Sequence, residues 1–103
     1  MIEVYDYNFK QQLARGHIIL MFYTDWCPMC PYVSNICERL ENDYTGRFLL
    51  VKINKDHNPT AVAEYDAIGV PYIFALKDGE LKGVFPGCRL EEYDGIVKAL
   101  LTM

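Results

Sequence analysis

The segment Trp26-Cys27-Pro28-Met29-Cys30-Pro31 (WCPMCP) decides the fold that this sequence predicts. It follows residues 17–24 (HIILMFYT), a nearly continuous apolar and β-prone run that is typical of a strand covered on both faces. After it comes one helical face of apolar residues: Val33, Ile36, Cys37, Leu40 and Tyr44. Gly46 ends that pattern. The two cysteines are therefore expected where a buried strand is followed by a helix.

This position favours redox chemistry. The first turn of a helix has unpaired N–H groups and the positive end of the helix dipole, and both favour a thiolate at Cys27. A free cysteine has a pKa of about 8.5 and is mostly protonated at neutral pH, so this environment increases its reactivity. Cys30 lies about one helical turn further on, where its sulfur can attack Cys27 and release a bound target. We expect Cys27 to be the exposed nucleophile and Cys30 the deeper, resolving cysteine.

A zinc site is the alternative for a Cys-x-x-Cys pair. Such a site normally needs a second Cys-x-x-Cys or two histidines at short spacing. His17 and His57 are isolated, and Cys37 lies on the apolar helical face. The sequence therefore favours redox chemistry and predicts no bound metal. We expect Cys37 to be a buried apolar residue, whereas Cys88 is either a packing residue or an accessible third thiol.

The other elements follow in an alternating order. Strands are predicted at residues 2–5, 48–53, 72–77 and 80–85, and helices at residues 8–15, from Asn58-Pro59 onward, and at residues 90–101. Asp78-Gly79 suits a type I′ turn between the last two strands. The order β-α-β-α-β-α-β-β-α predicts an α/β fold in which a central mixed sheet of about five strands is flanked by about four helices.

Composition limits the classes of function. With 103 residues, of which 51% are apolar, the chain is expected to form one domain over residues 1–103. Its 14 acidic and 10 basic residues give a net charge of -4 without any basic block, so nucleic acid and membranes are poor partners. The longest apolar run, residues 18–23, is too short to cross a bilayer, and the N-terminus does not resemble a secretory signal. We therefore expect a cytoplasmic protein.

Several motifs resemble those of the thioredoxin family, in the family's order and over nearly the whole chain. They are Trp26-Cys27-x-x-Cys30, Val51-Lys52-Ile53-Asn54 with His57-Asn58-Pro59, Ile68-Gly69-Val70-Pro71, Lys77-Asp78-Gly79-Glu80 and Gly87. The resemblance implies a thioredoxin fold and a protein-disulfide oxidoreductase whose Cys27–Cys30 disulfide is redox-active, with no other cofactor. Substrates are expected to bind at Trp26, Pro28, Met29, Val70, Pro71 and Gly87.

The resemblance also implies that the Val70–Pro71 peptide bond is cis and faces the disulfide. The residues alone favour a trans bond, because only about 5–6% of X-Pro bonds in folded proteins are cis. In the family, the backbone at the position of Val70 pairs with an extended segment of the substrate.

The chain departs from the family's pattern at the site itself. The family usually has Gly-Pro between its cysteines, whereas this chain has Pro28-Met29, and oxidising relatives also place a proline after the first cysteine. Met21 stands where thioredoxins usually have a buried aspartate that assists proton transfer at the second cysteine. Lys52, the usual neighbour of that aspartate, is retained, and Lys55 replaces an apolar residue of the docking surface. The direction of electron flow therefore stays open.

Three functions follow from these observations. The first is a protein-disulfide reductase. As the resemblance suggests, it would be a monomer that takes part in cellular electron transport and redox homeostasis, and a flavin-containing thioredoxin reductase would reduce it again after each turnover. The second is a disulfide oxidase or isomerase. The third is a thioredoxin-fold binding subunit that holds a partner at Trp26, Met29, Val70 and Pro71 without turnover.

Overall fold

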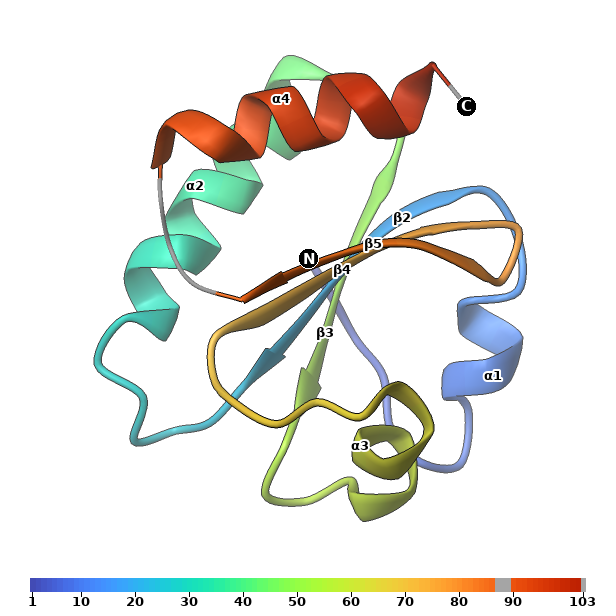
Figure 1. The fold of residues 1–103 in the computed structure, drawn as a ribbon, viewed down its shortest axis with the longest axis vertical. Coiled ribbons are helices and arrows are strands. Elements are labelled where there is room, and N and C mark those ends of the chain that lie inside the picture. Colours follow the sequence, from blue (N-terminus) through green and yellow to red (C-terminus); the bar gives the residue numbers. More distant parts are fainter. Residues whose placement is uncertain (87–89, 103) are drawn as a thin grey trace.

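The computed structural model describes residues 1–86 and 90–102 and has the predicted order of elements. The strands are β1 (Ile2–Glu3), β2 (His17–Tyr23), β3 (Leu49–Asn54), β4 (Tyr72–Lys77) and β5 (Glu80–Pro86). The helices are α1 (Phe9–Gln12), α2 (Cys30–Asp43), α3 (Pro59–Tyr65) and α4 (Leu90–Leu101). The predicted α/β class is therefore confirmed (Figure 1).

The strands form one mixed sheet in the order β1-β3-β2-β4-β5. β3 runs parallel to β1 and to β2, whereas β4 runs antiparallel to β2 and to β5. The central strand β2 is buried along residues 18–22, which confirms the prediction made from its apolar run. Because β2 lies at the centre, the loop that leaves it emerges in the middle of one end of the sheet, and this loop carries both cysteines.

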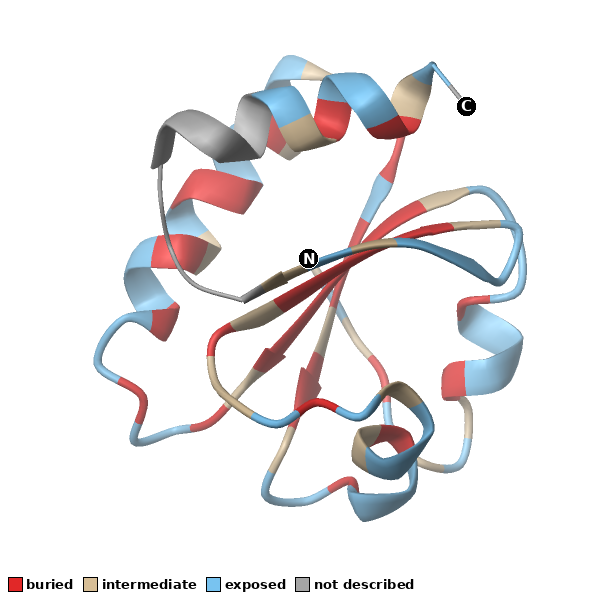
Figure 2. Ribbon diagram, viewed as in Figure 1, coloured by how far each residue is buried: buried red, intermediate tan, exposed pale blue. Residues whose placement is uncertain are grey.

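Side chains of β2 alternate between two packed faces of the sheet. Ile19 and Met21 pack with residues of α2 and α4, whereas Leu20 and Phe22 pack with residues of α1 and α3. Figure 1 shows α2 and α4 on one side of the sheet and α1 and α3 on the other. In Figure 2 the central strands are the buried layer between them. The helix that starts at the cysteines is thus held against the core.

The hairpin of β4 and β5 has the turn that its sequence predicts. Asp78 and Gly79 have φ values of 52° and 82°, as both central residues of a type I′ turn require. The Gly16 N–H donates to Asp78 Oδ1 at 2.8 Å, and the Asp78 N–H donates to the Gly16 carbonyl at 3.0 Å. The tip of the hairpin is therefore joined to the loop before β2.

The first two elements are shorter than predicted. The strand predicted at residues 2–5 is β1, Ile2–Glu3, and the helix predicted at residues 8–15 is α1, Phe9–Gln12. For β1 the cause is a side chain: the Tyr5 N–H donates to Asn8 Oδ1 at 2.8 Å and so turns the chain away from the sheet. Asn8 is consequently the residue before the helix rather than its first residue.

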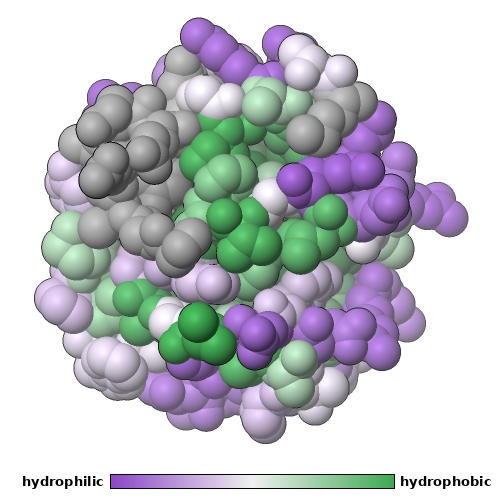
Figure 3. Space-filling view, viewed as in Figure 1, coloured by the Kyte–Doolittle hydropathy of each residue, from purple (hydrophilic) through white to green (hydrophobic). Residues whose placement is uncertain are grey.

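β5 is an edge strand with apolar side chains on its outer surface. Leu81 and Val84 are 47% and 41% exposed, and Figure 3 shows apolar side chains gathered over this strand. Lys82 and Glu80 form an ion pair at 3.1 Å on the same strand. Charged residues on an edge oppose its pairing with other chains.

Candidate active site

Cys27 and Cys30 form a disulfide in the connection between β2 and α2. Their Cα atoms are 5.4 Å apart. The Cys27 N–H donates to the Thr24 carbonyl at 3.4 Å, which turns the chain sharply at the end of β2. Pro31 lies in the first turn of α2, where the missing N–H of a proline costs no helical hydrogen bond. The strand-to-helix placement of the pair is thus confirmed.

The predicted difference in exposure between the cysteines is wrong. α2 begins at Cys30. Cys27 is 3 residues earlier in the sequence, so it lies in the loop before the helix and not in its first turn. Cys27 is 5% exposed and Cys30 is 3% exposed. The physical reason is the disulfide itself, which closes the short loop and draws Cys27 in against the helix start. The neighbouring residues Trp26, Pro28 and Met29 are the exposed ones.

An exposed apolar surface surrounds the disulfide. Trp26 is 68% exposed and Met29 is 40% exposed. The Trp26 indole is nevertheless fixed, because its Nε1–H donates to Asp56 Oδ2 at 2.8 Å. Asp56 is held in turn by its own N–H, which donates to Asn54 Oδ1 at 2.9 Å. Sequence reasoning missed Asp56, although its place just after the carboxyl end of β3 was a signal that it lies at the end of the sheet that carries the cysteines.

The Val70–Pro71 bond is cis, which confirms the expectation from the resemblance. Phe22 of β2 pairs with Tyr72 of β4, so Pro71 lies level with the last residue of β2. Figure 1 shows the loop before β4 and the loop before α2 at the same end of the sheet. The structure therefore brings Val70 and Pro71 to the end that carries the disulfide. Gly87 and Cys88 lie outside the described residues.

A pocket of about 250 Å³ lies beneath the disulfide. Its lining residues are Met21, Tyr23, Thr24, Asp25, Cys27, Cys30, Pro31, Ser34 and Lys52. Met21 is 2% exposed and shares this pocket with Cys30, so it occupies the position expected for the family's buried acid. A thioether cannot accept a proton in the pH range of the reaction, and this site lacks the usual base.

Lys52 reaches the same pocket from β3. It pairs in register with Met21, and its ammonium group lies 5.2 Å from the centre of the Tyr23 ring, a cation–π distance. The Tyr23 hydroxyl donates to Glu3 Oε2. Burial, and then the hydrogen bond to Glu3, raise the pKa of Tyr23 well above its ordinary value. In the described part of the chain, no carboxylate lies within ion-pair distance of Lys52.

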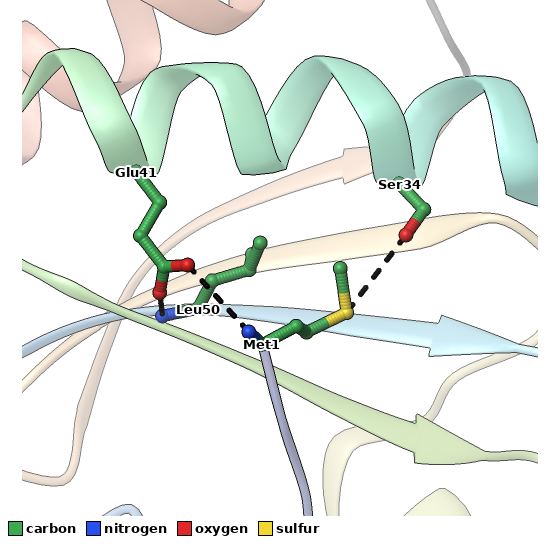
Figure 4. A network of polar contacts seen from close by, with 4 residues as sticks. All are labelled: Met1, Ser34, Glu41 and Leu50. Atoms are coloured by element: carbon green, nitrogen blue, oxygen red, sulfur yellow. Dashed lines mark hydrogen bonds and ion pairs between the residues drawn. The ribbon is translucent and has the colours of Figure 1, made fainter.

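Polar contacts fix α2 to the sheet behind the site (Figure 4). Glu41 Oε2 accepts the Leu50 N–H at 3.0 Å, and Glu41 Oε1 lies 3.6 Å from the Met1 nitrogen. About two turns closer to the disulfide, the Ser34 hydroxyl donates to Met1 Sδ at 3.9 Å. The helix that carries Cys30 is therefore anchored to β3 and to the segment before β1.

Among the side chains that the structure describes, no group of three or more His, Cys, Asp or Glu residues could hold a metal ion. No helix in the described part of the chain is both long enough and apolar enough to span a membrane.

Comparison with known proteins identifies the family. The sequence model of the thioredoxin family matches residues 1–101. The chain belongs to the thioredoxin family. It is 30% identical over 80 residues to thioredoxins of Staphylococcus haemolyticus and Staphylococcus saprophyticus, which covers 78% of this chain and 77% of each relative. A thioredoxin of Staphylococcus aureus is 29% identical over the same length. With its Cys27–Cys30 disulfide, this thioredoxin-family protein is a thiol–disulfide oxidoreductase that works by dithiol–disulfide exchange.

Proposed function

We propose that this protein reduces disulfides in other proteins, with Cys27 as the nucleophile and Cys30 as the resolving residue. The observation that carries the proposal is the Cys27–Cys30 disulfide at the start of α2, bordered by exposed Trp26 and Met29. A redox-active pair must meet a second macromolecule, and large exposed apolar side chains beside it provide a surface for that contact.

The proposed reaction has two exchanges. The Cys27 thiolate attacks one sulfur of the target disulfide, a mixed disulfide forms, and the other target sulfur leaves as a thiolate. Cys30 then loses its proton and attacks Cys27 Sγ, so that the Cys27–Cys30 bond forms and the second target thiolate leaves. A flavin-containing thioredoxin reductase would return two electrons to the disulfide. No cofactor other than this disulfide is required.

The order of attack follows from the surroundings of each sulfur. Cys27 lies in the connecting loop between exposed Trp26 and exposed Pro28, and it borders the positive end of α2. Cys30 is the first residue of α2 and is followed at once by Pro31. Both sulfurs are buried to nearly the same extent in the disulfide, so the assignment of Cys27 as the nucleophile rests on its place in the loop at the positive end of α2.

The proposed docking surface consists of Trp26, Pro28, Met29, Val70, Pro71 and, from the family's pattern, Gly87. Val70 is half-buried and precedes β4, which begins at Tyr72, so its backbone lies outside the paired strand. An extended target segment can pair with such a backbone while its apolar side chains contact Trp26 and Met29. The proposed species is a monomer of one domain, residues 1–103, that works in the cytoplasm. Its net charge of -4 supports protein targets over nucleic acid.

Replacing each cysteine by serine tests this assignment. Cys27→Ser should remain folded and form no mixed disulfide, because the attacking sulfur is gone. Cys30→Ser should attack but not resolve, and should therefore accumulate a stable mixed disulfide with a target. Intact mass spectrometry after exposure to a disulfide-bonded protein measures both results. Equal trapping by the two variants, or trapping by Cys27→Ser alone, would show that the nucleophile is misassigned.

A turnover assay separates this function from a binding subunit. The wild-type protein should accelerate the reduction of insulin by dithiothreitol, and a Cys27→Ser/Cys30→Ser double variant provides the matched control. A protein that only holds a partner would give the same rate as the double variant.

A further inference from the structure

One residue that lines the pocket beneath the disulfide has a buried polar atom that the fold itself does not satisfy. Thr24 is 3% exposed, and its Oγ1 has no hydrogen-bond partner among the described residues. Buried hydroxyls in proteins almost always have a partner, either protein or ordered water. Thr24 lines the pocket together with Cys30, so the residue with the unsatisfied hydroxyl borders the same space as the resolving cysteine.

This space has room and polarity for water. A single water needs about 10–15 Å³ of space for its centre, and the pocket offers about 250 Å³ on the same measure. A buried water needs two to four polar partners, and hydroxyls of Thr24, Tyr23 and Ser34 line the pocket. Tyr23 already donates its proton to Glu3, and Ser34 donates to Met1 Sδ. Thr24 is therefore the hydroxyl whose proton and lone pairs are all uncommitted.

Lys52 is the charged group of the pocket that favours deprotonation of Cys30. Lys52 from β3 brings a positive charge without a carboxylate partner among the described residues, and a nearby cation stabilises a thiolate. Asp25, from the loop after β2, is exposed and lines the same pocket. Glu3 of β1 is engaged by Tyr23. The thiolate is thus supported electrostatically, but Met21 provides no group to take the proton.

We propose that Thr24 is a positioning residue whose hydroxyl holds a pocket water, and that this water accepts the proton of Cys30 during release of the target. In this step the Cys30 S–H bond breaks and its proton passes through the water to bulk solvent. The Cys30 thiolate attacks Cys27 Sγ, the Cys27–Cys30 bond forms, and the bond from Cys27 to the target sulfur breaks. The leaving thiolate takes a proton from solvent. The inference rests on the proposed function, because it concerns the resolving step of that reaction.

Stopped-flow reaction of the reduced protein with 5,5′-dithiobis(2-nitrobenzoate) separates the two exchanges. The first phase, release of one thionitrobenzoate by Cys27, depends on reagent concentration. The second phase, attack of Cys30 on the mixed disulfide, is intramolecular and does not. A Cys88→Ser background excludes that thiol, and Cys30→Ser must show the first phase alone. If Cys30→Ser gives both phases, it is the proposed function that fails, not the role of Thr24.

Thr24→Val is the decisive variant, because valine keeps the β-branched shape and removes only the hydroxyl. Its second phase should be roughly three- to tenfold slower, the effect of one lost hydrogen bond, with an unchanged first phase. The pH at which the second phase reaches half its maximal rate should rise. Thr24→Ser, which keeps the hydroxyl, should restore both the rate and that pH. A thermal melt of Thr24→Val at or above the wild-type midpoint confirms that the fold is intact.

Two outcomes would overturn the proposal. One is a second phase of Thr24→Val with the wild-type rate and pH profile. The other is an equal or larger loss in Asp25→Asn, which would make the Asp25 carboxylate the proton acceptor in place of water held by Thr24. Support requires that Asp25→Asn retain the wild-type second phase.

Discussion

At the scale of single residues, Cys37 shows how burial decides whether a thiol takes part in chemistry. It is 2% exposed in the core between α2 and the sheet. Burial, and to a smaller extent the negative charges of Glu38 and Glu41, raise the pKa of Cys37 to about 12. A thiolate in that setting is desolvated and repelled by its neighbours, so Cys37 remains a protonated apolar residue.

We predict that Cys37 does not react with iodoacetamide at pH 8 in the folded protein. At that pH roughly one molecule in 10⁴ would carry its thiolate, given its raised pKa. Peptide mass mapping of the reduced protein should find Cys27 alkylated long before Cys37, and denaturation should make Cys37 react. The pKa of Cys37 is raised in the folded state, so the protonated thiol contributes to the free energy of unfolding. This contribution is fully present below about pH 8.5 and decreases as pH rises toward 12. Alkylation of Cys37 at the rate of Cys27 in the native protein would contradict this prediction.

Single residues of the site differ in how well the sequence predicted them. The resemblance implied that Met21 lies near the second cysteine, and the structure places both residues in the lining of one pocket. Asp56 and Thr24 could not be predicted in the same way. The Trp26–Asp56 hydrogen bond joins residues with a sequence separation of 30, and the unsatisfied state of Thr24 Oγ1 depends on which groups fold around it. Such pairings exist only after the elements have packed.

At the scale of elements, the strongest local patterns were predicted best. The predicted strand at residues 72–77 is β4 to the residue, since its boundaries are fixed by the Asp78-Gly79 turn. The end of β1 was predicted too far along the chain, because the contact of the Tyr5 N–H with Asn8 Oδ1 turns the chain there and no periodic pattern signals it. Apolar periodicity thus predicts the middle of an element better than its ends.

Two glycines, one in the hairpin turn and one in α4, should respond in opposite ways to replacement by alanine. Gly79 has a φ of 82°, where an L side chain is strained, so Gly79→Ala should lower the free energy of unfolding by about 1–2 kcal/mol. Gly95 lies within α4, and a Cβ added there meets no atom within 4 Å. Gly95→Ala should therefore raise the free energy of unfolding by about 0.5–1 kcal/mol. Urea unfolding of both variants measures the two values, and a Gly79→Ala midpoint equal to wild type would show that the turn tolerates a side chain.

At the scale of the whole molecule, one feature lay beyond any local pattern. The residues around Val70–Pro71 favoured a trans bond, and the expectation of a cis bond came from the family resemblance. Local sequence does not contain the reason, because the loop before β4 is positioned by the register of β4 against β2. Resemblance over residues 1–101 therefore carried information about the site that periodicity and turn chemistry did not.

The redox state and the stability of the whole molecule are linked by a thermodynamic cycle. If the folded protein holds its disulfide more tightly than the unfolded chain does, folding must favour the oxidised form by the same free energy. For this two-electron couple, each 30 mV of difference in potential corresponds to about 1.4 kcal/mol. A reductase needs a tightly held disulfide, whereas an oxidase is a strong oxidant because its reduced form is the more stable. The proposed direction of electron flow therefore fixes the sign of a stability difference.

We predict that the oxidised protein unfolds at a higher urea concentration than the reduced protein. Paired urea titrations with and without dithiothreitol measure the difference, and equilibration with glutathione buffers should give a potential that agrees with it through the cycle. The Cys27→Ser/Cys30→Ser double variant is the control, since its midpoint should not respond to dithiothreitol. A more stable reduced form would favour the oxidase alternative. It would also indicate that Lys52 is the main cause of the stability difference, because its unpaired charge in the pocket of Cys30 stabilises the thiolate of the reduced form. In that case Lys52→Gln should make the reduction potential more negative. The sign of the stability difference between the oxidised and the reduced protein would then depend on one side chain beneath the disulfide.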